Sequence, residues 1–487
     1  MKKALLLACI TLFSLSLHAQ QKYWIYFKDK TPEVPTLSKT ELYDLPINQA
    51  YLDSLSQLGI TARTNSKWLN AITAYLSQNE YESISTLGFV KALSPVEIHF
   101  REHSSTGSLQ AVQVLNQLNA DTLIALGWFG KGIKIGIIDG GFLGADEADE
   151  LSHILSNKQV AAYKNYIEKD VTNPYTGSAR YQDNHGTKVW TMIAGRSGSE
   201  KYFGTATEAM FYLARTDQGD KEYRGEEDHW VAAVEWMYEQ GVKLINSSVG
   251  YSTGFNDASQ NYSPSDVDGS SSAITKAANI ATKEKGMTIV LAAGNDGNNK
   301  FKVVSVPADA EGVITVGATD IRNWKRQYYS SIGPENLKHV KPDLSCYSVS
   351  GTSFAAPVIT GLIASLQQGF PEATPQEIRK ALEQSAHLSQ LPNNYLGYGV
   401  PNIKKAIDIL HGEKNKSQRK IIKTEADEVE VMMGSDNLVA FYKSDAINVL
   451  FQKLLISRNG KVTVKRQKEA ERTTVASPEK CVEIIWE

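Results

Sequence analysis

The sequence predicts an α/β domain with a central, mainly parallel sheet and helices on both faces, preceded by a small α+β segment and followed by a small all-β domain. Its 487 residues are enough for about three domains. Between residues 119 and 410, compact apolar runs alternate with helical patterns. Such runs are typical of strands buried on both faces of a parallel sheet, and their alternation with helices indicates that helices cover that sheet.

The segment before the α/β region, residues 20–105, mixes short strand-like runs with one helical pattern. The strand-like runs lie at residues 23–27, 90–93 and 96–100. The helical pattern covers residues 80–87. A polar stretch at residues 103–108 then predicts an exposed linker.

The central region, residues 106–411, supplies the elements of the α/β domain. Strands are predicted at residues 133–138, 209–214, 242–246, 287–292 and 313–316. Helices are predicted at residues 228–240, 271–285 and 353–367. Another helix begins at Thr374, because Pro375 occupies its first turn and Glu377 completes a capping box.

A charged run at residues 412–423 marks the boundary to the last domain, residues 412–487. The strands predicted in this domain are residues 428–432, 438–442, 447–456, 461–465 and 481–486. We therefore expect an all-β domain that lies outside the α/β core and is not needed for its chemistry.

Residues 1–19 predict an export signal. Lys2 and Lys3 give a positive start, residues 4–17 an apolar stretch and Ala19 a small residue suited to cleavage. A membrane anchor is the poorer interpretation because the run is too short to span a bilayer. Cys9 follows Leu-Leu-Ala but lies too early for a lipoprotein site. We expect an exported protein, secreted or in the periplasm or cell envelope, without a transmembrane anchor.

Composition excludes several classes of function. The net charge is only −3, with both signs spread along the chain, which argues against a nucleic-acid partner. No Cys/His cluster has zinc-ligand spacing and no His-Glu-x-x-His motif occurs, so no zinc site is indicated. Cys346 and Cys481, which remain after signal removal, form no disulfide framework, so the fold must depend on its core.

Asp139 is the first candidate catalytic residue. It ends the predicted strand at residues 133–138 and is followed by two glycines. Functional groups gather at the carboxyl ends of strands in an open α/β sheet, so this carboxylate is well placed to orient a histidine. The alternative is a turn-forming aspartate before Gly-Gly.

His185 and Ser353 are the other two candidates. His185 stands in Asp-Asn-His-Gly-Thr-Lys-Val, where the glycine lets a partner approach before an apolar, helix-like run; a lone surface histidine is the alternative. Ser353 stands in Ser-Gly-Thr-Ser-Phe-Ala-Ala-Pro and opens a predicted helix. Backbone N–H groups there point toward a developing oxyanion, although an N-capping serine is also possible.

In their order Asp, His, Ser, these motifs resemble those of the subtilisin-like serine peptidases over about residues 118–410. The Asp139 strand, the His-Gly-Thr-x-Val block and the Gly-Thr-Ser-x-Ala-x-Pro block all match. Two more blocks match in order: Leu-Ala-Ala-Gly-Asn-Asp-Gly, which contains Asn295, and Ile-Asn-Ser-Ser-Val-Gly, which ends at Gly250. Outside that context the Asn-Asp-Gly stretch would be interpreted as a turn.

The resemblance implies a role for each matched residue. Asp139, His185 and Ser353 would form a catalytic triad, and Asn295 would donate to the oxyanion. The strand block would pair with the backbone of the substrate peptide and line its cleft. Its substrate-binding residues would be Ser248, Val249 and Gly250.

Four features depart from the family pattern or add to it. Gly140 follows Asp139 where Ser or Thr is commoner, and residues 345–350 replace a longer loop before the nucleophile. Cys346, in that short loop, is either a competing nucleophile or a small buried residue, and its context favours burial. Asp266-Val-Asp-Gly269 suggests calcium, which is frequent in the family, but no full ligand set is present and a surface turn is favoured.

The segment at residues 20–105 weakly resembles the inhibitory pro-segments of these enzymes. The likeness lies in Ser-Lys-Trp-Leu-Asn-Ala-Ile at residues 66–72 and Val-Lys-Ala-Leu-Ser-Pro at residues 90–95. It implies that this segment inhibits its own enzyme within the same chain. An ordinary accessory domain is the alternative.

The expected function is an exported serine endopeptidase with polypeptide substrates, made as an inactive precursor. One alternative is a dedicated maturation peptidase with a single protein target. Another is a non-catalytic surface binding module on the same fold. The intact set of Asp139, His185, Asn295 and Ser353 weighs against the binding module, because a module without catalytic demand could lose any of them.

Overall fold

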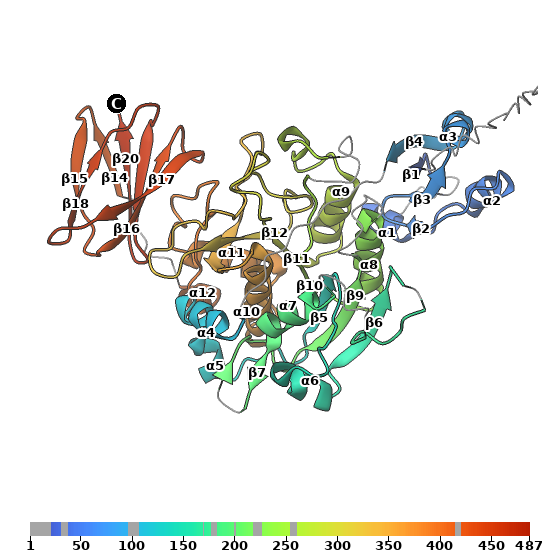
Figure 1. Cartoon of the computed structure of the whole chain (residues 1–487), viewed down its shortest axis with the longest axis horizontal. Helices are drawn as coiled ribbons and strands as arrows, with labels where there is room; N and C mark the ends of the chain where they lie inside the picture. The colour runs from blue at the N-terminus through green and yellow to red at the C-terminus, as the bar shows by residue number, and fades with distance from the viewer. Residues whose placement is uncertain are drawn as a thin grey trace, which may run out of the picture. The chain divides into compact units, whose positions relative to one another are not determined.

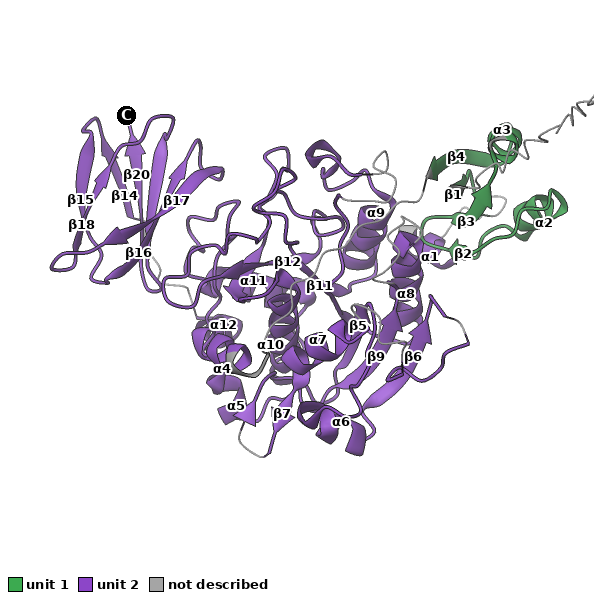
Figure 2. Cartoon of the chain, in the orientation of Figure 1, with its two compact units in different colours: residues 1–35, 45–96 green, residues 36–44, 97–487 purple. Residues whose placement is uncertain are grey.

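A computed structural model gives the fold of most of the chain. It describes residues 21–30, 38–95, 107–168, 170–176, 183–198, 201–217, 226–253, 261–413 and 420–487. The predicted export signal, the predicted strand at residues 96–100 and most of the predicted linker lie outside these ranges. The chain forms two compact units, residues 1–35 with 45–96 and residues 36–44 with 97–487 (Figure 2).

The first unit is a small α+β domain, as predicted. Its antiparallel sheet has the order β2-β3-β1-β4, with strands β1 (Gln21–Phe27), β2 (Thr64–Ser66), β3 (Ala71–Leu76) and β4 (Val90–Pro95). Helices α2 (Gln49–Gln57) and α3 (Gln78–Ser85) complete it. Ile25, Ile72 and Leu55 are among the buried residues of its own apolar core. Helix α1 (Lys39–Asp44) belongs to the second unit.

The second unit is built on a parallel sheet of seven strands in the order β13-β12-β11-β10-β5-β9-β6 (Figure 1). The strands are β5 (Lys134–Asp139), β6 (Val160–Asn165), β9 (Met210–Arg215), β10 (Leu244–Ser247), β11 (Thr288–Ala292), β12 (Ile314–Thr319) and β13 (Leu344–Tyr347). Strand β5 lies between β10 and β9, and the chain passes from β9 on one side of it to β10 on the other. Ligands bind at such a switch point, outside the carboxyl ends of the strands.

Helices cover both faces of this sheet (Figure 1). Helices α7 (His185–Ala194) and α10 (Ala356–Gly369) pack on each other and on one face, and α8 (Glu227–Glu239) and α9 (Ala273–Asn279) cover the other. Because both faces are covered, every residue of β10, β11 and β12 is buried. Smaller elements complete the layers: α5 (Asp121–Leu126), α6 (Ser152–Ser156), β7 (Arg196–Ser197), β8 (Lys201–Tyr202), α11 (Pro375–Ser385) and α12 (Ile403–Leu410).

Part of the predicted linker is wrong. Gly107 and Ser108 begin helix α4 (Gly107–Gln117), which packs on strand β13. The physical reason is the apolar face of the helix, since Ala111, Val114 and Leu118 are fully buried in the core of the α/β domain.

The C-terminal domain is all-β, as predicted. A five-stranded sheet with the order β14-β20-β19-β16-β17 faces a two-stranded sheet of β15 and β18. The strands are β14 (Lys420–Thr424), β15 (Glu428–Met432), β16 (Asn437–Lys443), β17 (Val449–Ile456), β18 (Lys461–Lys465), β19 (Arg472–Ala476) and β20 (Cys481–Trp486). The end of the charged run taken as a boundary is itself strand β14, because it pairs in parallel with β20.

Candidate active site

Asp139 and His185 meet at the carboxyl edge of the sheet. Asp139 ends β5 and is fully buried, and His185 is the first residue of α7. The Nδ1 atom of His185 lies 2.7 Å from Oδ1 of Asp139. Glycine at position 186 permits this approach, because a Cβ there would lie 2.5 Å from the carbonyl oxygen of Gly141. The sequence pattern placed His185 in a turn before the helix, whereas it opens the helix.

Arg215, which sequence reasoning missed, ties the segments of Asp139 and His185 together. This arginine ends β9 beside Asp139 and is 3% exposed. Its Nε donates to the carbonyl of Gly140 at 2.9 Å, and its Nη2 donates to Oδ1 of Asp183 at 2.8 Å. Its position at the carboxyl end of a predicted strand was the signal that could have identified it.

Asp217 is a further carboxyl group that the sequence did not single out. It lies two residues beyond the end of β9 and is 3% exposed. The hydroxyl of Thr216 donates to it, and the hydroxyl of Tyr251 lies 3.4 Å from its Oδ1. Burial raises the pKa of Asp217 to about 7, and its charge interacts with those of Asp139 and His185.

Ser353 lies in a single 3-10 turn, Thr352–Phe354, just before α10. The predicted helix therefore begins three residues later than expected, at Ala356. Ser353 Oγ donates to the carbonyl of Ser248 at 3.3 Å, and Ser248 Oγ donates back to the carbonyl of Ser353 at 2.9 Å. The Phe354 ring lies 5.5 Å from the imidazole of His185, between ring centres. The segment of Ser353 thus packs against both His185 and the residue that follows β10.

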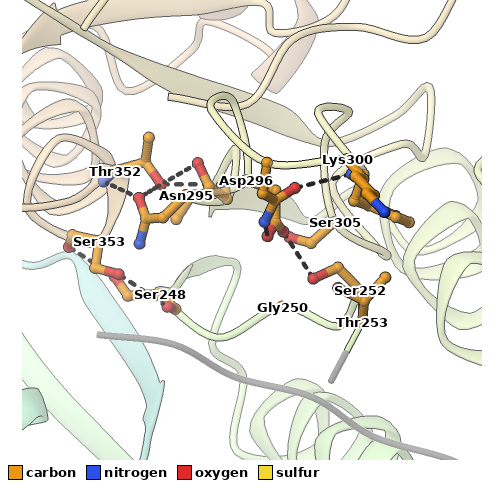
Figure 3. A pocket seen from close by; sticks show the side chains of 14 residues that line it. Ser248, Gly250, Ser252, Thr253, Asn295, Asp296, Lys300, Ser305, Thr352 and Ser353 are labelled. Carbon is orange, nitrogen blue, oxygen red and sulfur yellow. Dashed lines mark hydrogen bonds between the residues drawn. The ribbon is translucent and has the colours of Figure 1, made fainter. Parts of the chain in front are cut away.

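Asn295 is held against the residue before Ser353. Its Oδ1 accepts hydrogen bonds from the backbone N–H of Thr352 at 2.9 Å and from the Thr352 hydroxyl at 3.2 Å. A backbone N–H needs an acceptor, so these contacts fix which end of the amide faces Thr352. The amide nitrogen then faces the side where Ser353 and Ser248 lie (Figure 3). That orientation suits a donor to an oxyanion.

A cavity of about 400 Å³ opens beside these groups (Figure 3). Its lining residues include Ser248, Gly250, Asn295, Ser305 and Ser353. A Cβ at Gly250 would lie 2.3 Å from Ser305 Oγ, so any larger residue there would require the Ser305 side chain to move.

The far end of this cavity is polar. Asp296 accepts a hydrogen bond from Ser252 Oγ at 2.7 Å there. Val249, predicted with Ser248 and Gly250 as substrate-binding, is 2% exposed and does not line the cavity with its side chain.

Cys346 is buried rather than poised for catalysis. It lies on β13 with no exposed surface, its thiol donates to the carbonyl of Ala355 at 3.5 Å, and burial raises its pKa. A buried thiol of this kind is a poor nucleophile. No disulfide joins it to Cys481.

Within the described ranges, no group of three or more His, Cys, Asp or Glu side chains is placed to hold a metal ion. Asp268 accepts hydrogen bonds from the backbone of Ser270 at 2.8 Å and of Ser271 at 2.7 Å, which is the geometry of a surface turn. Among the same residues, no helix is both long and apolar enough to cross a membrane.

Two family models match the chain. Residues 130–399 match the model of the Subtilase family, and residues 38–111 match the model of the Peptidase S8 propeptide domain of Bacteroidota. The matched subtilase region is more than half of the chain and contains every catalytic candidate. The propeptide match covers most of the segment before the α/β domain and agrees with the weak resemblance of that segment to a pro-segment.

Relatives and solved structures agree with these matches. Subtilisin NAT of Bacillus subtilis subsp. natto is 27% identical over 366 residues, which are 73% of this chain and 85% of the relative, and subtilisin E of Bacillus subtilis has the same values. The epidermin leader peptide processing serine protease of Staphylococcus aureus matches in structure with a TM-score of 0.58 at 19% identity, over 81% of this chain and 99% of the other.

Fervidolysin from Fervidobacterium pennivorans matches with a TM-score of 0.57 at 17% identity, over 94% of this chain and 71% of the other. At such identities the structures support the fold, and the family model supports the assignment. The chain belongs to the subtilase family of serine peptidases.

Proposed function

We propose that this chain is an exported serine endopeptidase that hydrolyses peptide bonds through an acyl-enzyme on Ser353. The observation that carries the proposal is the 2.7 Å contact between His185 Nδ1 and Asp139 Oδ1, with the nucleophile segment packed against the same imidazole. A histidine held by a buried carboxylate next to a serine is the arrangement that acyl transfer requires.

The proposed reaction uses side chains and water without a cofactor. Ser353 Oγ attacks the peptide carbonyl carbon while His185 takes the hydroxyl proton at Nε2. Asp139 holds the proton-bearing Nδ1 and stabilises the imidazolium that forms. His185 then protonates the leaving amine, and water attacks the acyl-enzyme by the same route in reverse. In the structure Ser353 Oγ donates its hydrogen bond to the carbonyl of Ser248. The proposed reaction needs this hydroxyl to turn toward His185, since catalytic hydrogen bonds often tighten only when substrate binds.

The oxyanion would be held by two donors. Asn295 Nδ2 lies on the correct side of the nucleophile, and the backbone N–H of Ser353 opens a turn that leads into α10. Donors aimed at the developing charge supply a large part of the catalysis in this type of reaction.

The substrate would be a polypeptide bound in extended form. Its backbone would pair with residues 248–250, which continue the line of β10, and the side chain before the cleaved bond would enter the cavity of about 400 Å³. The N-terminal residues predicted as an export signal would take the precursor out of the cytoplasm, to the medium, the periplasm or the cell envelope.

A labelled fluorophosphonate tests the proposal. The wild-type protein should take the label at Ser353, and Ser353→Ala should lose both labelling and peptide hydrolysis. Cys346→Ala is the matched control and should keep most of both, because the Cys346 thiol is buried away from the cavity.

Failure of the wild type to take the label would favour the binding-module alternative. Labelling together with a very narrow cleavage profile on a peptide mixture would favour a dedicated maturation peptidase instead.

A further inference from the structure

Helix α4 covers the outer edge of β13, the strand that leads to the nucleophile. Edge strands present backbone N–H groups that need partners. Two glutamines of α4 supply them: Gln117 Oε1 accepts from the backbone N–H of Tyr347 at 2.8 Å, and Gln110 Oε1 accepts from that of Val349 at 3.2 Å. The two glutamines are seven residues apart and share one face of the helix. The two N–H groups are two residues apart, one at the last residue of β13 and the other just beyond it.

Gln110 is the one whose contacts continue toward Ser353. Its Nε2 donates to Ser348 Oγ at 3.3 Å, and Ser348 Oγ donates to the carbonyl of Gly351 at 2.7 Å. Gly351 has a φ of +135° and stands two residues before Ser353. All of these side chains are buried, with Gln110 4% exposed and Ser348 fully enclosed.

The segment that these contacts fix is short. After β13 ends at Tyr347, only residues 348–351 separate the sheet from the nucleophile turn. Asn295 anchors the far end of the segment through Thr352, and the hydroxyl of Tyr329 donates to the carbonyl of Ser348 at 2.8 Å. Without the Gln110 side chain, the N–H of Val349 would lose its partner at the near end.

We propose that Gln110 is a positioning residue, which holds residues 348–351 so that Ser353 Oγ and its backbone N–H keep their reactive geometry. The proposal rests on the proposed function, since it concerns the same nucleophile. Small displacements of a nucleophile are costly because acyl transfer needs aligned atoms.

The position of Gln110 also limits where the pro-segment is cut. The family propeptide model ends at residue 111, inside α4, but Gln110 lies in the first turn of that helix. A cut that leaves a fully active enzyme must therefore lie before Gln110.

The test compares Gln110→Met with Gln113→Met in the full chain after maturation. Gln113 is a half-buried glutamine of the same helix whose side chain takes no part in these contacts. With the mature form of each variant verified by intact mass, Gln110→Met should lower kcat by about tenfold or more with KM changed by less than about twofold. Gln113→Met should match the wild type in both constants. An unchanged kcat in a folded Gln110→Met enzyme would overturn the proposal.

Ser348→Ala gives an independent arm if Gln110→Met does not fold. It should also lower kcat, and an unchanged kcat in folded Ser348→Ala would overturn the proposal. Where both single variants fold, the double variant should lose no more than the worse single variant, because both act through one chain of contacts. Multiplying losses in the double variant would overturn the proposal. Failure of the wild type to take a fluorophosphonate at Ser353 would instead count against the proposed function, so the two failures are distinguishable.

Discussion

At the residue scale, the side chain of Asn295 has one observed interaction and one proposed interaction, and two substitutions separate them. Its Oδ1 holds the backbone N–H of Thr352, and its Nδ2 is proposed to donate to the oxyanion. Asn295→Ala removes both interactions and should lower kcat by about 10²–10³-fold, the loss found for one oxyanion donor in a subtilisin. Asn295→Asp keeps the oxygen for Thr352 but not the donor. It should lose as much kcat while keeping a melting temperature closer to that of the wild type.

Steady-state kinetics with thermal unfolding of both variants checks this prediction. A change confined to KM would make Asn295 a substrate-binding residue. A kcat for Asn295→Asp near that of the wild type would show that the donor is not used.

Asp217 should influence the pH dependence of activity. Burial raises its pKa to about 7, and the groups around it are Asp139, His185, Thr216 and Tyr251. As the carboxyl ionises, its negative charge favours the protonated imidazole of His185. Catalysis needs the neutral imidazole, so the charge delays the rise of activity with pH. Asp217→Asn removes the charge and should move the acid limb of the kcat/KM profile to lower pH.

The pH profile of kcat/KM for wild type and Asp217→Asn measures this shift. Tyr251→Phe is the control, since it loses one hydrogen bond to Asp217 but leaves the carboxyl in place. An acid limb at the same pH in wild type and Asp217→Asn would show that the carboxylate does not act on His185.

The residues proposed to react were easier to identify from the sequence than the residues that support them. Asp139, His185 and Ser353 stand next to glycines and small residues in distinctive short blocks, so their chemistry is visible locally. Arg215 and Gln110 carry no such block. Their partners lie 75 and 238 residues away in the chain, in the contacts with Gly140 and Ser348. Contacts over such separations depend on how distant segments pack together, which local sequence patterns do not show.

At the scale of elements, the strands buried between two helical layers were predictable and the edge strands were not. Strand β6 lies at one edge, and its burial alternates irregularly, so it lacks an apolar run. Strand β13, at the other edge, has only four residues, one of them a serine, and α4 covers it. In the C-terminal domain β19 is central but contains two buried threonines, which hide it from a search for apolar runs.

From the sequence, the C-terminal β domain is expected to be dispensable for folding and catalysis. The packing of its strands argues against that expectation. Leu388, Leu391 and Leu396 of the α/β domain share one apolar cluster with Phe441 and Val449 of the β domain. A chain stopped after Leu410 would leave this cluster open to water, at a cost of about 1.5–3 kcal/mol for each large side chain exposed. We expect the truncated chain to unfold at a lower temperature and to aggregate.

A single substitution in the β domain tests its effect on unfolding free energy separately from its effect on kcat. Gln452 accepts a hydrogen bond from the backbone N–H of Arg326 at 3.0 Å and donates to its carbonyl at 2.9 Å. Gln452→Ala should cost about 1–3 kcal/mol of unfolding free energy and leave kcat unchanged. A truncated chain with wild-type melting temperature and kcat would support the expectation of dispensability.

At the scale of the whole molecule, the first unit holds most of the region that matches the propeptide model, and the second unit holds the peptidase domain together with the C-terminal β domain. The match and the units do not coincide everywhere, because α1 and the first residues of α4 lie in the matched propeptide region but belong to the second unit. There the buried Nζ of Lys285 donates to the Asp44 carboxylate at 2.8 Å and to the carbonyl of Thr40 at 2.8 Å. This contact ties part of the pro-segment to the domain that it is proposed to inhibit.

The last prediction is that the enzyme removes this pro-segment from itself. The cut would need Ser353, whereas removal of the export signal would not. Purified wild-type protein should begin in the predicted linker, between residue 103 and Gly107, the first residue of α4. A cut inside α4 would break a helix that is buried at Ala111 and Val114. Ser353→Ala protein should begin near residue 20 and be larger by about 10 kDa, given 53.7 kDa for 487 residues. Intact-mass measurement on both proteins decides between these states. The separated pro-segment should inhibit mature enzyme when added back, and inhibit a Lys285→Met enzyme less well, because that enzyme cannot hold Asp44. If both proteins begin near residue 20, the segment is a permanent domain and is not removed by this enzyme.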